Sequence, residues 1–212
     1  MLDHVAADFV HAIDDSEDGN VQLHLSTAHF EAGLDHVCKS PADYGTVELI
    51  VCRPDVDERL VLAEATLDAS CGLVGDNWLV RGSSRRPEKT ADPGKQVTVM
   101  NARAALLVAG DPDRRQLAGD QLYLDFDISQ ANLPAGSRLT IGTAVIEVSP
   151  QPHLGCPKFS ARFGTEALRF VNSRVGRQLR LRGLNARIVV PGSVRIGDTV
   201  RKLPATEPVS VS

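Results

Sequence analysis

Residues 151–164 are dense in reactive and charged side chains and read Gln-Pro-His-Leu-Gly-Cys-Pro-Lys-Phe-Ser-Ala-Arg-Phe-Gly. They hold the thiol of Cys156, the imidazole of His153 and the cations of Lys158 and Arg162. The glycines and prolines among them predict an irregular backbone. A β-pattern precedes the segment and a basic helical pattern follows it. The sequence therefore predicts a loop where elements converge, which is where functional residues are usually found.

Outward from this loop, the chain has the alternation and the turn residues of short β-strands. We expect strands over residues 46–51, 59–67, 96–100, 121–127, 138–141, 144–148, 186–190 and 194–200. Helices are expected over 102–109, where Asn101 is the N-cap and Gly110 the end, and from Thr165 onward. Many short strands with few helices predict a mainly β fold, either a barrel or a highly twisted sheet with peripheral helices.

The chain shows no internal repeat and no second core, so we expect one domain over residues 41–203. Residues 1–40 are an N-terminal extension, which begins with a short helix or an acidic tail and continues into a strand near residues 21–25. Residues 204–212 have no pattern and are predicted to be a disordered tail.

The bulk composition excludes some functions. The 212 residues carry a net charge of −4 and a pI of about 5.9, which argues against a general nucleic-acid binder. No apolar run approaches the roughly 18 residues of a membrane span, and the pattern of the N-terminal residues does not predict a secretory signal. We expect a cytoplasmic protein with neither nucleic acid nor membrane as a partner.

Four cysteines occur without any C-x-x-C pair, at positions 38, 52, 71 and 156, so the spacing lacks a zinc signature. Cys52 lies in an apolar strand pattern and is expected to be a buried hydrophobe. His24, His29 and His36 do not share a helical face and are expected to be ordinary histidines rather than metal ligands. Only Cys156 has the neighbours that would favour a thiolate.

A thiol acts as a nucleophile or metal ligand in its ionised form, and nearby cations lower its pKa. Residues 157–197 contain nine Lys and Arg residues and a single acid, Glu166, although the whole chain is acidic. Two interpretations stay open. One is an anion-binding cleft beside a polarised Cys156, suited to a phosphorylated ligand. The other is a solvated basic helix face beside an inert cysteine.

Three motifs together resemble those of the MOSC domain, found at the C-terminus of molybdenum-cofactor sulfurases and as stand-alone bacterial proteins. They are residues 72–76 (Gly-Leu-Val-Gly-Asp), residues 155–164 (Gly-Cys-Pro-Lys-Phe, then Arg-Phe-Gly) and residues 190–198 (Val-Pro-Gly-Ser-Val-Arg-Ile-Gly-Asp). They occur in the family's order, and the resemblance spans roughly residues 40–203.

The resemblance implies a strand-rich β-barrel and one essential cysteine, which maps to Cys156. It implies that this thiol carries or transfers sulfur as a persulfide, or ligates molybdenum held by a phosphorylated pterin. His153, Lys158 and Arg162 would stabilise the thiolate and an anionic ligand. The Gly75-Asp76 pair would shape the pocket wall. Pyridoxal phosphate, a further family label, is not expected here, because this chain lacks the aminotransferase-like domain that would hold it.

Three functions are therefore open. The chain is a sulfur carrier or transferase that uses Cys156, a non-enzymatic module that binds or delivers the molybdenum cofactor, or a molybdenum-dependent reductase of N-hydroxylated compounds. The ligand in each case is an anionic small molecule such as a phosphorylated pterin. The partner protein would be a sulfur donor or an electron-transfer protein.

Overall fold

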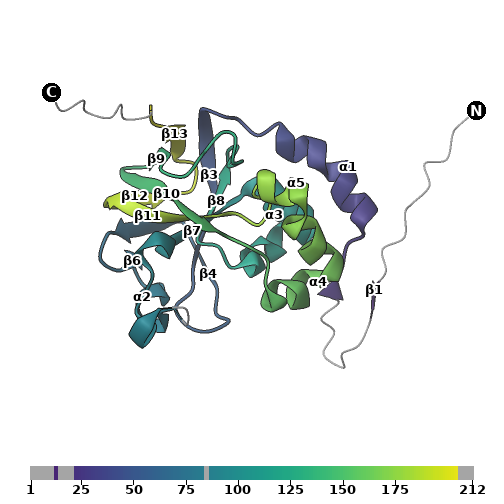
Figure 1. The fold of residues 1–212 in the computed structure, drawn as a ribbon, viewed down its shortest axis with the longest axis horizontal. Helices are drawn as coiled ribbons and strands as arrows, with labels where there is room; N and C mark the ends of the chain where they lie inside the picture. The colour runs from purple at the N-terminus through teal and green to yellow at the C-terminus, as the bar shows by residue number, and fades with distance from the viewer. Residues whose placement is uncertain (1–11, 14–21, 84–85, 205–212) are drawn as a thin grey trace, which may run out of the picture.

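The computed structural model describes residues 12–13, 22–83 and 86–204, and its centre is a closed β-barrel (Figure 1). The main sheet has eight strands in the order β13-β9-β10-β11-β7-β8-β3-β4, and pairing of β13 with β3 closes all of them except β4 into a ring. These strands are β3 (Tyr44–Cys52), β4 (Leu60–Leu62), β7 (Val97–Asn101), β8 (Leu122–Asp125), β9 (Arg138–Ile141), β10 (Ala144–Pro152), β11 (Leu184–Val190) and β13 (Thr199–Lys202). The expected strand-rich barrel is confirmed.

The long strand β3 makes closure possible because different parts of it pair with different neighbours. Its first residues pair with β13, where Gly45 lies opposite Val200, and its last residues pair with β4. Its other edge pairs with β8, with an irregularity between Val47 and Leu49 that bends the strand. A closed ring leaves fewer unpaired edges in the sheet.

The barrel interior is filled mainly by aliphatic side chains, as the low aromatic content of the sequence requires. Ile50, Leu122 and Ile146 are fully buried there, and Phe126 is the aromatic member of this core. The connection Gly142-Thr143 joins β9 to β10 as a hairpin, as the sequence predicted.

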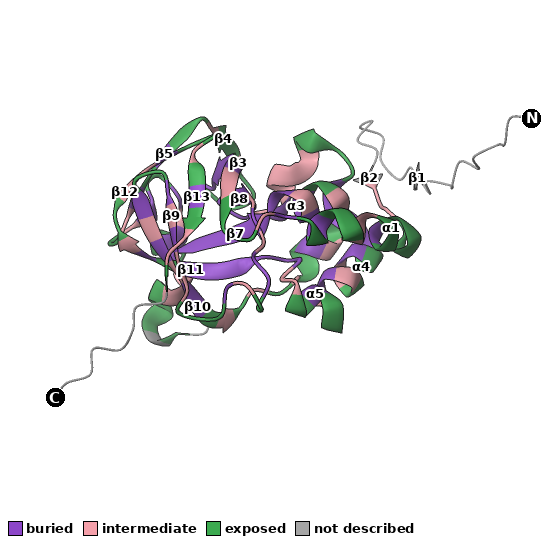
Figure 2. Ribbon diagram, turned by 90° about the horizontal axis from the view of Figure 1, so that it is seen from above, coloured by how far each residue is buried: buried purple, intermediate pink, exposed green. Residues whose placement is uncertain are grey.

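Helices gather on one side of the barrel and enclose a second core (Figure 2). They are α1 (Thr27–Cys38), α3 (Ala102–Ala109), α4 (Pro157–Asn172) and α5 (Arg174–Gln178). Asn101 caps α3 by accepting a hydrogen bond from the Ala104 amide, and Gly110 ends it in a left-handed conformation, both as predicted. In α1, fully buried Phe30 stacks on Phe170 of α4 with ring centroids 5.0 Å apart.

Smaller elements complete the structure. A three-stranded sheet in the order β12-β5-β6 lies beside the barrel, and the remaining described elements are short. The bounds are β1 (Ala12–Ile13), β2 (Gln22–Leu23), β5 (Glu64–Asp68), β6 (Gly72–Leu73), α2 (Trp78–Arg81), β12 (Gly192–Arg195) and the 3-10 helices η1 (Pro87–Lys89), η2 (Pro93–Lys95) and η3 (Pro112–Ala118).

The cysteine loop is shorter than the sequence suggested. Strand β10 continues to Pro152 and α4 already begins at Pro157, so the expectation of a loop over residues 151–164 was wrong. A proline fits the first helical position, where its missing N–H is not needed. Gly164 is instead a kink inside α4, with φ of +88°.

Two other expectations change in detail. The predicted strand over 194–200 is divided into β12 and β13, because the chain turns around Gly197 at φ of +87°.

Near the N-terminus, Ala12–Ile13 pair as a strand with Gln22–Leu23, and the rest of the predicted acidic helix or tail lies outside the described residues. The predicted C-terminal tail also lies outside them from residue 205. Within the described part of the chain, no helix has the length and apolar character needed to span a membrane.

Barrel closure can be tested at Gly45. An added Cβ there would overlap the carbonyl oxygen of Asp125, although the backbone of Gly45 is not in the left-handed region. We expect Gly45→Ala to lower the free energy of unfolding by about 2–3 kcal/mol. Gly136→Ala is the control, because a Cβ at Gly136 meets nothing and only its φ of +87° costs about 1 kcal/mol. Urea denaturation measures both, and a smaller loss for Gly45→Ala would contradict the close approach.

Candidate active site

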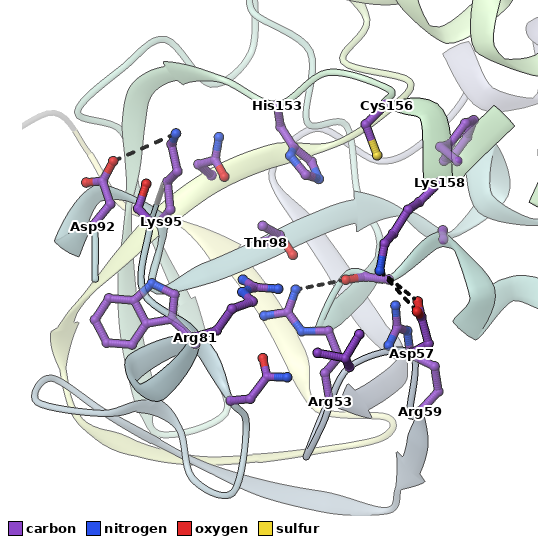
Figure 3. Close-up of a pocket in the computed structure, with 18 of the residues that line it drawn as sticks. Arg53, Asp57, Arg59, Arg81, Asp92, Lys95, Thr98, His153, Cys156 and Lys158 are labelled. Atoms are coloured by element: carbon purple, nitrogen blue, oxygen red, sulfur yellow. Dashed lines mark hydrogen bonds and ion pairs between the residues drawn. The ribbon is translucent and has the colours of Figure 1, made fainter. Parts of the chain in front are cut away.

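A cationic cavity lies at the end of the barrel, where α4 begins, and has a volume of about 350 Å³ (Figure 3). Its walls come from segments that are far apart in the sequence: the loop after β3, α2 and the residues after it, η2 and β7, the end of η3, and the connection from β10 into α4. The basic lining residues are Arg53, Arg59, Arg81, Lys95, Lys158, Arg162 and Arg182, and the acidic ones are Asp55, Asp57 and Asp92.

Cys156 is the exposed thiol on the rim of this cavity, immediately before the first residue of α4. No other cysteine is among the residues that line it in the described part of the chain. Cys52 is buried in the barrel, and burial raises the pKa of its thiol. Cys38 is exposed on α1, and desolvation followed by the charges of Asp35 and Asp127 raises its pKa.

One wall is built by a buried ion pair between Arg53 and Asp76. The Arg53 guanidinium donates from Nε to Oδ2 at 2.8 Å and from Nη2 to Oδ1 at 2.9 Å. The backbone amides of Arg53 and Trp78 also donate to this carboxylate, both at 3.0 Å. The Asp76 side chain is fully buried and does not line the cavity. It therefore acts by fixing Arg53, whose Nη1 donates to the Gly119 carbonyl at 3.0 Å.

A second buried carboxylate, Asp120, fixes two more lining residues. Its Oδ2 accepts a hydrogen bond from Arg182 Nη1, and its Oδ1 lies 2.9 Å from His153 Nε2. Arg182 Nη2 also donates to the Ala118 carbonyl at 2.9 Å, and its guanidinium lies over the Phe159 ring at 5.0 Å. Burial would raise the pKa of Asp120, but the nearby Arg182 and His153 outweigh it and lower the value to about 2.

The contact with Asp120 defines the protonation state of the His153 imidazole. Burial, followed by the charge of Arg182, lowers the pKa of the imidazole, so the ring is neutral near pH 7. Because ionised Asp120 can only accept, Nε2 must carry the ring proton, and Nδ1 is left as a basic lone pair. His153 is therefore a neutral member of the cavity lining, which differs from the expected role of stabilising the thiolate.

Lys158 and Arg162 lie on α4 and share one acidic partner, Asp57, from the loop between β3 and β4. Lys158 Nζ lies 3.0 Å and Arg162 Nη2 2.6 Å from the Asp57 carboxylate. The hydrogen bond from Lys158, together with the charges of Lys158, Arg162 and Arg59, lowers the pKa of Asp57. Arg162 also donates from Nη1 to the Leu117 carbonyl at 2.9 Å. Figure 3 shows Lys158 reaching across the cavity mouth to Asp57.

Several buried polar atoms of the lining have no hydrogen-bond partner within the protein. These atoms are Nε of Arg59, Nε of Arg182 and Oδ1 of Asn77. Buried polar groups normally have hydrogen-bond partners, so such atoms point to a ligand or ordered water. Burial and the nearby Arg162 and Arg53 lower the pKa of Arg59, which reflects an excess of positive charge. These residues therefore fit an anionic, polar ligand.

The structure brings together four of the residues singled out from the sequence, namely His153, Cys156, Lys158 and Arg162. It places Gly75 and Asp76 behind the wall, where Gly75 has φ of +88° beside Cys52. Sequence reasoning missed the other side of the cavity, which comes from Arg53, Asp57, Arg59, Arg81, Lys95 and Arg182, and it missed the buried Asp120 that pairs with Arg182. The one signal in the sequence is the Arg-Pro-Asp turn at residues 53–55, which directly follows a predicted strand.

The described residues contain no group of three or more His, Cys, Asp or Glu side chains that could hold a metal ion. Cys156 is the one thiol among the described residues that line the cavity.

Comparisons with known proteins place the chain in a family. The sequence model of the MOSC domain matches residues 83–201, which is more than half of the chain. A search of curated proteins found no match. Among solved structures, the YuaD protein from Bacillus subtilis is similar, with a TM-score of 0.53 and 15% identity over 77% of this chain and 97% of that one.

Two further structures share the fold. A crystal structure titled as that of a hypothetical protein has a TM-score of 0.52 and 20% identity over 78% of this chain and 71% of that one. YiiM from Escherichia coli has a TM-score of 0.50 and 20% identity over 78% of this chain and 73% of that one. The chain belongs to the MOSC domain family. The family is associated with the molybdenum cofactor.

The Asp120 cluster gives a pH-dependent prediction. The folded pKa of about 2 lies below the usual value of roughly 3.9, so the ion pair stabilises the fold fully above about pH 4 and loses this effect as the pH falls toward 2. We expect Asp120→Asn to lower the free energy of unfolding by about 3 kcal/mol at pH 7 and by progressively less below pH 4. Urea denaturation across pH measures this difference.

The control for this prediction is Asp113→Asn, which removes an exposed carboxylate from η3, the 3-10 helix that precedes Asp120. It should change stability by less than about 0.5 kcal/mol at any pH. A pH-independent loss in Asp120→Asn, or an equal loss in Asp113→Asn, would contradict the role of the buried pair.

Proposed function

We propose that the cavity binds the molybdenum cofactor through its phosphorylated pterin, and that Cys156 is the thiol that reacts with or ligates the bound group. The observation that carries this proposal is an exposed thiol at the rim of a cavity with seven cationic and three acidic side chains. Arginine and lysine bind phosphate strongly, and guanidinium groups do so with two parallel hydrogen bonds. A volume of about 350 Å³ is in the usual range for a small-molecule site.

Different lining residues would have different tasks. Arg59 and Arg182 have unpartnered Nε atoms to offer to phosphate or to the pterin ring, and Asn77 offers an acceptor. Arg53 is held too firmly by Asp76 to move, so it contributes fixed positive charge. The bound cofactor would supply molybdenum, a redox-active metal. The protein's residues would bind, orient and shield it.

His153 would accept or hold a proton beside the bound ligand. Its Nδ1 lone pair is available because Asp120 holds the other nitrogen as a donor. General bases work best when their pKa lies near the working pH.

The exposure of Cys156 favours a second function, sulfur carriage. The Cys156 thiolate would attack the outer sulfur of a persulfide on a donor protein, form an S–S bond and release the donor's thiolate. The sulfur atom then resides on Cys156 as a persulfide, and no external oxidant is required. A thiol at a protein surface can be reached by such a partner, whereas one enclosed in the barrel cannot.

A third possibility, the reduction of N-hydroxylated compounds, would require molybdenum and an electron-transfer partner. Molybdenum content together with activity on such compounds would favour it, and a persulfide mass shift on Cys156 would favour sulfur carriage. We propose the cytoplasm as the location, because a reducing compartment keeps Cys156 available as a thiol.

Cys156→Ser tests cofactor binding directly. Protein purified from its own host should lose molybdenum and pterin on the order of tenfold, with its thermal unfolding unchanged, because the thiol ligand is gone. Elemental analysis and mass spectrometry measure the content. Cys38→Ser is the matched control, since Cys38 is also exposed but does not line the cavity. Full cofactor content in Cys156→Ser would contradict the assignment.

Thiol reactivity gives an independent check. At neutral pH, iodoacetamide should alkylate Cys156 at least about tenfold faster than Cys52, because Cys52 is only 5% exposed and burial raises its pKa. Peptide mapping by mass spectrometry assigns each rate. Slow and equal labelling of all four thiols would count against a reactive Cys156.

A further inference from the structure

Asp57 holds an unusual position in the cavity mouth. It lies in the loop between β3 and β4 and is one of the few non-glycine residues with positive φ, at +63°. Its carboxylate lies between Lys158 and Arg162, with Oδ2 3.0 Å from Lys158 Nζ and Oδ1 2.6 Å from Arg162 Nη2. One carboxylate thus ties the loop to the helix that follows Cys156 (Figure 3).

The two cations that Asp57 binds are well placed for a ligand. Lys158 and Arg162 are one helical turn apart on α4, both line the cavity, and Cys156 lies just before that helix. Arg162 converges with Arg59 beside Gly119: a Cβ built on Gly119 would lie 3.2 Å from Arg59 Nη2 and 3.7 Å from Arg162 Nη1. Two guanidinium groups that face the same point repel each other unless an anion lies between or beside them.

The contact between the Asp57 carboxylate and Lys158 is weak enough for another anion to replace the carboxylate. Its side chain is 55% exposed and that of Lys158 is 62% exposed, so water competes for both. The exposed pair of Asp57 with Lys158 therefore contributes little net free energy, whereas Arg162 is the less exposed partner. The left-handed backbone of Asp57 also carries a conformational cost, which the loop can release when the carboxylate leaves its partners.

We propose that Asp57 is a built-in competitor for the ligand's anionic group: its carboxylate occupies Lys158 and Arg162 in the free protein and is displaced when an anion binds. The loop residues from Asp55 to Glu58 then move away from α4, and Lys158 and Arg162 bind the anion instead of Asp57. This inference rests on the proposed function in one respect, since it requires that the cavity bind anions.

The test compares Asp57→Asn with Asp55→Asn. Each variant removes one negative charge from the same loop and the same cavity lining, but only Asp57 pairs with Lys158 and Arg162. The probe is inorganic phosphate, and the readout is the protection of Cys156 from iodoacetamide, a neutral reagent, followed by peptide mapping. Asp57→Asn should bind phosphate about tenfold more tightly than the wild type, and Asp55→Asn should change affinity by less than about threefold.

A second readout uses the charge of the reagent. The ratio of the alkylation rates of Cys156 by anionic iodoacetate and by iodoacetamide should rise about tenfold in Asp57→Asn, because the cations become free to attract the anion. Thermal unfolding of each variant confirms that the fold is kept.

The outcomes separate the two proposals. One outcome is that phosphate protects Cys156 in the wild type, but Asp57→Asn does not bind phosphate more tightly or Asp55→Asn gains as much affinity. Asp57 is then not a specific competitor, and the anion site stands. If phosphate protects Cys156 in none of the three proteins, the anion site itself is wrong, and both proposals fail.

Discussion

The buried carboxylate of Asp120 is the interaction on which the cavity depends. It lies between η3 and β8 and holds His153, which follows β10, and Arg182, which precedes β11. Three segments that are distant in sequence are thus fixed at the end of the barrel where α4 starts. A charge with no exposed surface must be compensated by close partners, so the position of each partner is narrowly restricted.

The same principle explains how so many cations can share one cavity. Two of the lining guanidinium groups use part of their donors on a buried carboxylate and a backbone carbonyl: Arg53 on Asp76 and Gly119, and Arg182 on Asp120 and Ala118. Because the guanidinium group is planar and carries five N–H donors, the donors that are not used in these bonds point in other directions. The protein compensates these charges only in part, and the cavity keeps a positive balance for an anion.

The scarcity of aromatic residues shapes the division into two cores. The barrel is filled by branched aliphatic side chains, which pack well on a pleated surface. Most of the large aromatic side chains lie between the barrel and the helices, where Phe159 and Phe163 of α4 pack with ring centroids 4.9 Å apart. These two rings come from the cysteine segment itself, so the packing that anchors α4 also holds Cys156 at the rim.

The sequence by itself determined the β-rich barrel, the hairpin at Gly142-Thr143, the helix that begins after Asn101 and the family, because periodicity, turn residues and motifs are local properties. It also singled out Cys156, Lys158 and Arg162 as candidates, which are close together along the chain and line one cavity. Tertiary structure alone decided that Asp76 supports Arg53 from behind, that His153 is neutral beside Asp120 and that Asp57 binds the α4 cations. Those relationships join residues 23, 33 and about 100 positions apart. Charge pairing at such separations depends on barrel closure, and no local pattern encodes it.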